Sequence, residues 1–595
     1  MNAPDWGNER RRGPALRLGP WRFGGRFVVA MLALGVVASG CALVTPAPPP
    51  PLPSTLGITT SPGLYPFFSP SETDYISRCN SSTPLVVSIA APDGTAVSVA
   101  GQPWGAGVFS VTVPQAAGQD VVIAVLAPSQ PEAVYYVRCL PSDFPTWGVA
   151  KSGQTQSDGY VSVPLSSTET GHCTIFDNNG VPVWWGPSNP SPFCTMLPDG
   201  NMGWIVNGKL EEHALDGSLV RTISPVPTGN ADNPDAGLAD GHDLLVLPNG
   251  DYVLVTGTTR TGVDLSTIGG PASTSVSDPV IEELTPSGGL VWSWDTLDHV
   301  PVSEMNQQWF GQYITGGSAP YDVFHWNSID FTGSGFVVSY RHLDAVFDID
   351  QTSGSILWKL GGAAPRTTSA DGTTTTSSTT ITAADGDFAT ADIGSTITDS
   401  LGNIPAGTTI TAVTDPTTAT LSQAATGTST ADTFTANAEG LTVESDPVFS
   451  GGSHFGGQHD ARLLGDGTVS LYDDGTNLGR APRVVRYQLD TTARTATLLE
   501  SVTDPIVSSS PCCGSARKLP AGGWAIGWGG TDTATETTSD NTTRAFLLEF
   551  SSGTLIYRWV PIPAGQLNRA ALRAGMDAQY ANSTAAHAEA PAPKH

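Results

Sequence analysis

The sequence has little positive charge for its length. Lysine and arginine together number 27, against 55 aspartate and glutamate residues, so the formal net charge is −28. An acidic surface of this kind repels phosphate backbones. The charge balance therefore argues against nucleic acid as a partner.

Charged residues of either sign are also scarce, at 14% of the chain, whereas glycine (66) and proline (47) are plentiful. This mixture favours many short strands joined by tight turns over helices. At 595 residues the chain is too long for one ordinary domain. We predict an all-β protein with two or three domains.

The apolar run near the N-terminus, residues 27–40, is too short for a comfortable membrane span. It follows an arginine-rich segment and ends in small residues directly before Cys41, which is the pattern of an export signal. The stretch ASGC that ends at Cys41 resembles a bacterial lipobox, with Ala38 where leucine is usual. We predict a signal peptide over residues 1–41 and a cell-surface lipoprotein anchored to the membrane by lipid on Cys41. Plain secretion and an uncleaved anchor are the alternatives.

If Cys41 carries lipid, six cysteines remain, an even number that suits an oxidising compartment. One pair flanks a segment of alternating strands, a second could close a hairpin-sized loop, and the third is adjacent in sequence. The adjacent pair has two interpretations, separate thiols or a disulfide ring, and no cysteine spacing indicates a zinc site. The candidate pairs are Cys79 with Cys139, Cys173 with Cys194, and Cys512 with Cys513.

Two short regions precede the main body of the chain. Residues 42–70 are rich in proline and predict a stiff linker. Residues 71–145 alternate apolar and polar positions in short strands separated by turns such as the one at 92–94. We predict a small N-terminal β-sandwich with an immunoglobulin-like outline over residues 71–145.

A coarse internal repeat begins after Trp147, and it is the strongest indication of fold. Each unit combines a glycine turn followed by a strand with an outer hairpin that contains an aromatic strand. Six such units predict a six-bladed β-propeller, divided between residues 146–366 and 449–563. The turn-and-strand halves are residues 157–163, 197–206, 247–255, 332–340, 465–472 and 519–528, and the hairpins are residues 176–185, 211–223, 281–294, 346–360, 484–499 and 547–559.

Residues 367–448 interrupt this repeat. They open with a threonine- and serine-rich run, and their middle has its own alternating strands without histidine, arginine or cysteine. We predict an inserted all-β module that acts as a spacer or an adhesion element, with no catalytic role. The alanine-rich residues 564–595 lack strand periodicity and predict a flexible tail with some helix.

Histidine is scarce, with ten residues in the chain, yet three histidines share one context. His242, His325 and His459 each precede an apolar strand, a glycine turn and a second strand. Equivalent positions in successive blades of a propeller converge on the central axis, so we expect these side chains to meet at one mouth. Arg341 ends the strand that is expected to pair with the strand after His325. The hairpin formed by these two strands would bring Arg341 to the same end of the central channel as the histidines.

A lone histidine beside a strand is usually a structural hydrogen-bonding group, but the set of three with an arginine points to a site. Three imidazoles suit zinc. A central arginine would repel a divalent cation, however, and it favours an anion instead. Asp460 directly follows His459, and it could orient that imidazole or cap a turn.

Three short motifs resemble those of the arylsulfotransferase family, in the same order. They are HWNS at residues 325–328, SYRH at 339–342 and QHDA at 458–461. The resemblance covers roughly residues 145–365 and 450–560, with the inserted module as the departure. It implies a small N-terminal β-domain followed by a six-bladed propeller, as the repeat predicts.

The resemblance also implies a chemistry. A channel histidine, which corresponds to His459, would be transiently sulfated, while His242, His325 and Arg341 would hold the sulfonate. A neutral imidazole is a nucleophile at neutral pH, and cationic groups stabilise charge on the transferring group. The donor would be an aryl sulfate rather than a nucleotide sulfate, because no glycine-rich nucleotide loop is evident, and the acceptor would be a phenol. No cofactor is implied.

Two other functions are compatible with the sequence. A propeller without activity could serve as a surface binding or adhesion protein, which the insert and the acidic exterior suit. A metal-dependent propeller lyase or hydrolase would use the same histidines as ligands. A sulfate-transfer assay separates both from the enzyme, and a metal analysis tests the second.

Overall fold

The structure is a computed structural model that describes residues 55–165, 171–189, 191–228, 237–363, 366–389, 392–449 and 454–581. The predicted signal peptide, Cys41 and residues 42–54 of the predicted linker lie outside these residues. The rest of the predicted linker contains two strands, Gly57–Ser61 and Leu64–Tyr65, and is therefore not a simple spacer. Among the described residues, no helix has the length and apolar character needed to cross a membrane. Strands dominate, and the only α-helix of the described residues is α1 (Arg569–Ala581). The all-β class is confirmed.

The first nine strands form two sheets with a shared core. Burial alternates along two of these strands, which is the pattern of a sheet with one face inward. Val87 and Val137 come from different sheets and both are fully buried in the common core. A disulfide joins Cys79 to Cys139 beside this core. One sheet contains β1 (Gly57–Ser61), β4 (Leu85–Ala90) and β7 (Val108–Val113), and the other contains β2 (Leu64–Tyr65), β3 (Asp74–Ser77), β9 (Ala133–Cys139), β8 (Asp120–Leu126), β5 (Ala96–Val99) and β6 (Gly105–Ala106).

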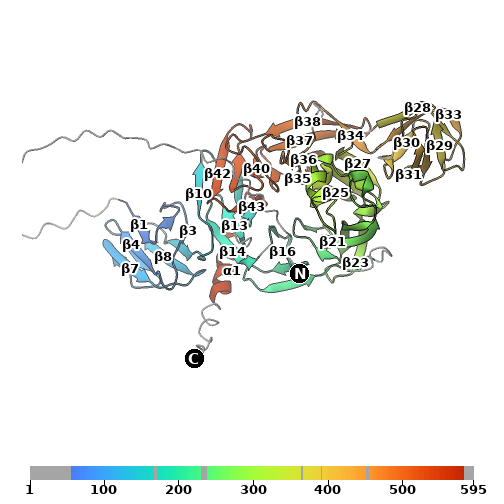
Figure 1. The fold of residues 1–595 in the computed structure, drawn as a ribbon. Coiled ribbons are helices and arrows are strands. Elements are labelled where there is room, and N and C mark those ends of the chain that lie inside the picture. Colours follow the sequence, from blue (N-terminus) through green and yellow to red (C-terminus); the bar gives the residue numbers. More distant parts are fainter. Residues whose placement is uncertain are drawn as a thin grey trace, which may run out of the picture. The chain divides into compact units, whose positions relative to one another are not determined.

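Most of the remaining strands pair antiparallel with their neighbours in the chain (Figure 1), and two of the resulting groups belong to one nine-stranded sheet. The strands fall into six groups in chain order. The first group is β11 (Ser157–Ser162), β13 (Gly171–Asp177), β14 (Pro182–Asn189) and the C-terminal β44 (Val560–Pro563), and the second is β15 (Cys194–Met196), β16 (Met202–Val206), β17 (Lys209–His213) and β18 (Leu219–Ile223). The third group is β19 (Leu238–Ala239), β20 (Leu245–Val246), β21 (Tyr252–Val263), β22 (Thr274–Leu284) and β23 (Leu290–Asp295), and the fourth is β24 (Trp326–Phe331), β25 (Gly335–Tyr340), β26 (Ala345–Asp350) and β27 (Ile356–Gly361). The fifth group is β35 (His459–Leu463), β36 (Thr468–Asp473), β37 (Arg483–Asp490) and β38 (Thr495–Val502), and the sixth is β39 (Ser515–Lys518), β40 (Trp524–Gly527), β41 (Thr533–Thr537) and β42 (Arg544–Phe550), which β10 (Trp147–Lys151) extends.

Burial differs among the strands of these groups, and it is complete in the second strand of the fourth group and of the fifth. Every residue of β25 and of β36 is buried, so both faces of these strands are covered. By contrast, β18 and β23 expose much of their length. The C-terminal strand β44 pairs with β11, so the end of the region returns to its beginning. The count of six blades stays a prediction.

Ion pairs and hydrogen bonds join the first strands of different groups. The side chain of Asn327 on β24 donates to the carbonyl of Gln458, at 2.8 Å. The backbone N–H of Ala461 donates to Ser328, at 2.9 Å. Asp460 neither orients His459 nor caps a turn. Its buried carboxylate accepts from Arg462 at 2.9 Å and from Arg517 at 2.7 Å, which ties β35 to β39.

Two further disulfides are present. Cys173 on β13 is joined to Cys194 on β15, and thus links two neighbouring strand groups. The adjacent residues Cys512 and Cys513 are joined to each other, which decides between the two interpretations that the sequence left open.

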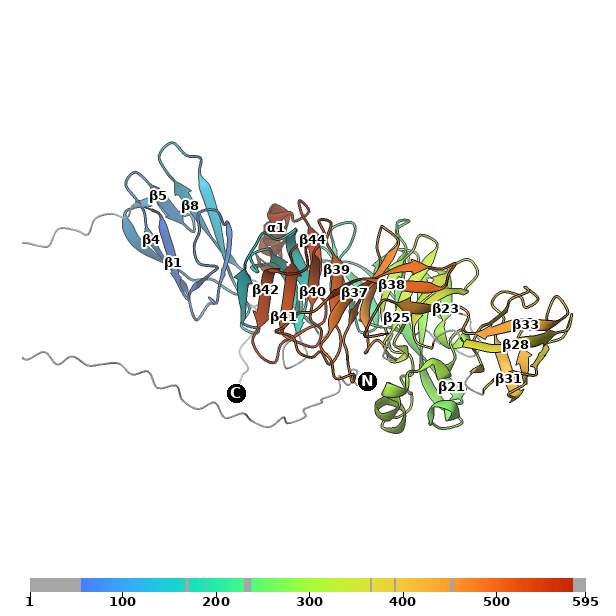
Figure 2. The same ribbon diagram turned by 90° about the horizontal axis from the view of Figure 1, so that it is seen from above.

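The inserted module folds as one six-stranded sheet around a small core of its own (Figure 2). Its bounds differ from the predicted 367–448 at the C-terminal side. β34 (Gly440–Glu444) pairs in parallel with β27 and with β38, and thus bridges two strand groups of the main body. The insert's strands are β28 (Arg366–Thr374), β29 (Thr380–Ala383), β30 (Ile397–Asp399), β31 (Ile410–Asp415), β32 (Thr418–Leu421) and β33 (Ser429–Ala436).

Part of the segment expected to be a flexible tail is the packed helix α1. Leu572 and Met576, one turn apart on one face, are buried in the largest core. Arg569 and Arg573, also one turn apart, both pair with the carboxylate of Asp74, at 3.1 and 2.6 Å. The sequence predicted some helix in this segment, but it did not predict that the helix packs on the core.

Candidate active site

The structure brings His242, His325 and His459 together. The rings of His242 and His325 lie edge to face, with centroids 5.1 Å apart. His242 and His459 each approach the ring of Tyr557 edge-on, with centroids 5.6 and 6.2 Å away. The three residues are far apart in sequence but lie at similar points of their strand groups. His459 begins β35, His325 directly precedes β24, and His242 lies between β19 and β20.

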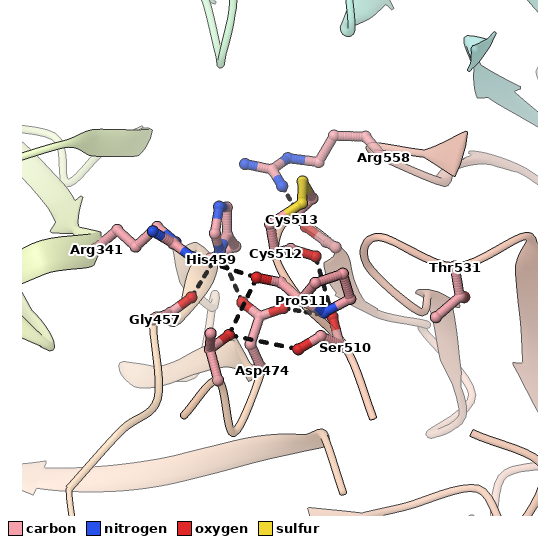
Figure 3. The surroundings of a disulfide bond; sticks show 12 residues. Arg341, Gly457, His459, Asp474, Ser510, Pro511, Cys512, Cys513, Thr531 and Arg558 are labelled. Carbon is pink, nitrogen blue, oxygen red and sulfur yellow. Dashed lines mark hydrogen bonds and ion pairs between the residues drawn. A yellow bond between two sulfur atoms is a disulfide. The ribbon is translucent and has the colours of Figure 1, made fainter. Parts of the chain in front are cut away.

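The hairpin of β24 and β25 returns Arg341 to the same site. The backbone N–H of Arg341 donates to the carbonyl of His325 at 2.8 Å. Figure 3 shows the guanidinium of Arg341 directed toward His459. His325 itself has a φ of 48°, in the left-handed region, which a histidine adopts only when its surroundings fix it.

Contacts from other elements hold the guanidinium of Arg341 in place. The side chain is 5% exposed. Its Nη1 donates to the hydroxyl of Tyr313 at 3.0 Å, and its Nη2 donates to the carbonyl of Pro511 at 3.2 Å. The ring of Trp309 lies 4.3 Å below the guanidinium carbon. The buried Nε atom has no hydrogen-bond partner among the described residues.

Each of the three histidines has an aspartate at its Nδ1 atom. Asp240 accepts from Nδ1 of His242. Asp322 lies 2.6 Å from Nδ1 of His325. Nδ1 of His459 lies 2.8 Å from the Oδ2 atom of its aspartate, Asp474. An imidazole that donates from Nδ1 presents its other nitrogen, Nε2, as the acceptor or nucleophile.

The environment of His459 favours its neutral form. The side chain is 1% exposed, and burial lowers the pKa of His459 well below its ordinary value. The neighbouring cations Arg558 and Arg341 lower that pKa further. A neutral imidazole is the form that can act as a nucleophile.

Arg558 is a second buried cation of the site that the sequence did not single out. It is 1% exposed and lies over the ring of Tyr557, with the guanidinium carbon 4.3 Å from the ring centroid. Its Nη2 donates to the carbonyl of Asn327 at 2.8 Å, and Nη1 donates to the carbonyl of Gly514. Its position beside His459 is visible in Figure 3.

The sequence motifs hold this arrangement together. The Nε2 atom of Gln458 donates to the carbonyls of Tyr340 and Ala345, at 3.1 and 2.9 Å. Asn327 in turn donates to the carbonyl of Gln458. The asparagine of the first motif and the glutamine of the third thus fasten the segment that carries His459 to the hairpin that carries Arg341.

One group of described side chains has the spacing of a metal site. The ligand atoms of Asp322, His325 and His342 lie within 4.8 Å of one another. Both nitrogens of His342 are already used, since Nδ1 donates to the carbonyl of Asp322 at 2.8 Å and Nε2 accepts from Arg341 at 3.1 Å. An arginine bonded to a would-be ligand opposes a divalent cation, so these residues do not fit a metal.

Comparison with protein families gives one match, to the model described as Arylsulfotransferase (ASST), over residues 146–558. No curated protein matches the chain. Among solved structures, a 6-phosphogluconolactonase candidate from Bacteroides fragilis is 11% identical, over 69% of this chain and 99% of its own, with a TM-score of 0.30. Hydrazine synthase from Kuenenia stuttgartiensis is 12% identical, over 47% and 77%, with a TM-score of 0.21. Scores this low carry no argument about fold or function.

Proposed function

The chain belongs to the arylsulfotransferase family, and on that premise we propose that it moves a sulfuryl group from an aryl sulfate to a phenol through a histidine intermediate. The observation that carries the proposal is a buried His459 whose Nδ1 lies 2.8 Å from Asp474, beside two histidines and two arginines. Membership of the family supports sulfotransferase activity in general. The residue roles and the substrates below are part of the proposal.

The first half-reaction would transfer the sulfuryl group to His459. The Nε2 lone pair attacks sulfur, the bond between sulfur and the aryl oxygen breaks, and the aryloxide leaves with that electron pair. Charge on the sulfonate oxygens would be neutralised by Arg341, whose Nε atom has no partner among the described residues. His242 and His325 lie beside it, and either of them in its protonated form could donate a proton to the departing oxygen.

The second half-reaction would reverse these steps with a new phenol. The acceptor oxygen attacks sulfur, the bond between nitrogen and sulfur breaks, and its electron pair returns to Nε2 of His459. The proton of the acceptor hydroxyl returns to the histidine that supplied one to the first aryloxide, so protons balance over the cycle. Two successive transfers through one enzyme-bound group give ping-pong kinetics.

The same proposal includes the six-bladed propeller and the location of the protein. The pairing of β44 with β11 supports sheets arranged around a common centre. Disulfides between Cys79 and Cys139 and between Cys173 and Cys194 are compatible with an exported protein. Lipidation of Cys41 and attachment to a membrane remain proposals from the sequence.

The direct test is an assay of the purified protein with a chromogenic aryl sulfate. With phenol present, we expect continuous release of the chromophore and formation of phenyl sulfate. Without an acceptor, we expect a burst of one chromophore per active site. The protein quenched at that point should carry one sulfuryl group on the peptide that contains His459, as read by mass spectrometry. A folded protein that transfers sulfate without any such adduct would contradict the covalent mechanism.

The burst should persist at acidic pH. Protonation of His459 would remove the nucleophile, and because its pKa in the folded protein lies well below 6.5, the neutral form survives as the pH falls through that value. We expect a flat burst rate constant from pH 7.5 to below pH 6.5, measured with a donor whose leaving group needs no protonation. A burst rate constant that halves near pH 6.5 would instead indicate that the nucleophile is a histidine with an ordinary pKa.

Removal of the insert should leave turnover within about twofold of the full chain, because a surface module with its own core need not support the site. The strand pairing fixes where to cut. Arg366 is paired with Ala436, so residues 367–435 can be replaced by a short glycine and serine bridge that spares β34. A steady-state assay alongside a thermal melt provides the measurement. Loss of turnover in a folded variant would mean that the insert completes the site.

A further inference from the structure

We propose that Asp474, held by Ser510, is the positioning residue that fixes the proton of His459 on Nδ1 and balances the positive charge that the ring acquires on sulfation. This inference rests on the proposed function of His459 as the nucleophile. It assigns roles to two residues that neither the sequence motifs nor the family match singles out.

The geometry around Nδ1 of His459 decides the tautomer. The atom lies 2.8 Å from the carbonyl oxygen of Gly457 and 2.8 Å from Oδ2 of Asp474. A backbone carbonyl can only accept a hydrogen bond, so the ring must donate from Nδ1. The neutral imidazole then carries its lone pair on Nε2, and Figure 3 shows that second nitrogen on the side of the ring away from Asp474.

Asp474 itself has little freedom to move. It is fully buried, and its Oδ1 accepts from the hydroxyl of Ser510 at 2.6 Å. A methyl group added at Gly529 would lie only 2.1 Å from the Ser510 oxygen and 3.2 Å from Oδ1 of Asp474. The backbone of Gly529 therefore packs closely against Ser510 and the carboxylate.

The segment that carries Ser510 is itself anchored next to the disulfide of Cys512 and Cys513 (Figure 3). The hydroxyl of Ser510 lies 3.0 Å from the carbonyl oxygen of Cys512, which also accepts from the backbone N–H of Gly530 at 2.6 Å. The carbonyl of Pro511 accepts from Arg341. The segment 510–513 therefore positions both the His459–Asp474 pair and Arg341, the cation proposed to bind the sulfonate.

The carboxylate has a chemical role beyond geometry. When Nε2 forms its bond to sulfur, the ring keeps the Nδ1 proton and becomes positively charged. Arg341 and Arg558 disfavour that charge, since both already act to lower the pKa of His459. Burial raises the pKa of Asp474 well above its ordinary value, whereas a cationic ring 2.8 Å away would stabilise its ionised form. The ionised carboxylate would then balance the charge of the sulfated ring, and the Nδ1 proton stays on the ring throughout.

The neighbouring aspartates do not share this role. Asp460 follows His459 in sequence but pairs with Arg462 and Arg517. Asp473 precedes Asp474 but pairs with Arg480 and Arg483, at 2.7 and 2.9 Å. Successive residues of a strand point to opposite sides, so only the second of the two adjacent aspartates reaches His459.

The test compares Asp474→Asn with Ser510→Ala in single-turnover experiments on the full chain, with a chromogenic aryl sulfate and no acceptor. For Asp474→Asn, we expect the burst rate constant at saturating donor to fall roughly 10- to 100-fold, the size typical when the hydrogen-bond partner of a metal-binding histidine is removed. The fall is bounded because Gly457 still holds the Nδ1 proton. The donor concentration at half-saturation should change by less than about twofold, because neither residue contacts the sulfonate.

Ser510→Ala removes one hydrogen bond to the carboxylate and should slow the burst by roughly two- to tenfold. An unchanged burst in Asp474→Asn would overturn the proposal, as would a loss that appears only as weaker donor binding. If Asp474→Asn does not fold, an unchanged burst in Ser510→Ala overturns it instead. Absence of any sulfuryl adduct in the unmodified protein would refute the proposed function, whereas a normal adduct there with no effect of either variant refutes only the role of Asp474.

Discussion

Replacement of His459 by asparagine is expected to abolish sulfuryl transfer. Asparagine keeps a hydrogen-bonding group near Asp474 and Gly457, but it offers no nitrogen lone pair that can form a stable bond to sulfur. Losses above ~1,000-fold are typical when a covalent nucleophile is removed. The measurements are kcat/KM for the chromogenic donor, and mass spectrometry of the quenched protein, in which the adduct on the His459 peptide should be absent.

A matched control is provided by His213 on β17. Like His459, it is largely buried, at 9% exposed, and has a carboxylate partner, since Nε2 lies 2.9 Å from Glu211. Its ring stacks on Trp204, with centroids 4.3 Å apart, and it belongs to a different strand group from the site histidines. His213→Asn should leave transfer within a few-fold of the unmodified protein. Persistence of transfer in His459→Asn, with the adduct on His242 or His325, would reassign the nucleophile.

The meeting of the three histidines could be predicted from the sequence because the signal is repeated. His242, His325 and His459 each stand before an apolar strand and a glycine turn, and a repeat in sequence becomes a shared position in space. The motif residues Asn327 and Gln458 also fit this reasoning, since they bond between the segments that carry the histidines.

The aspartates and the second arginine that surround these histidines were not predicted from the sequence. Asp240 and Asp322 stand two and three residues before their histidines, where a local pattern could have indicated them. Asp474 directly follows β36, the strand that pairs with β35, and lies 15 residues after His459. Arg558 comes from a different strand group, 99 residues after His459. Neither contact follows from a short fixed spacing in the sequence.

The error at the end of the insert has a similar cause. Residues 440–444 read as one more strand of the inserted module because they follow it without a break in composition. Their parallel pairing with β27 and β38 depends on two strands that lie on either side of the insert in the chain. Strand propensity predicts that a segment is extended, but it does not predict which sheet the segment joins.

Arg341→Gln is expected to lower kcat/KM on the order of 100-fold or more. Glutamine is neutral, so the charge that would stabilise the sulfonate oxygens in the transition state is lost, and removal of one such group typically has this effect. Arg341→Lys should recover only part of the loss. A lysine ammonium restores the charge, but it lacks the planar fork that bonds Tyr313 and Pro511 together while leaving Nε directed to a ligand.

Arg486→Gln on β37 is the matched control, because this arginine also pairs with carboxylates, Asp466 at 3.0 Å and Glu500, but lies away from the histidines. Its kcat/KM should stay within about twofold of the unmodified protein, since a partly exposed ion pair contributes little beyond stability. If the arginine acts on the sulfonate in the transition state, the Arg341→Gln loss should appear in both half-reactions, in the burst without acceptor and in the release of sulfate to phenol. A loss confined to one half-reaction would instead assign Arg341 to binding of the donor or the acceptor ring, and full activity would remove it from the site.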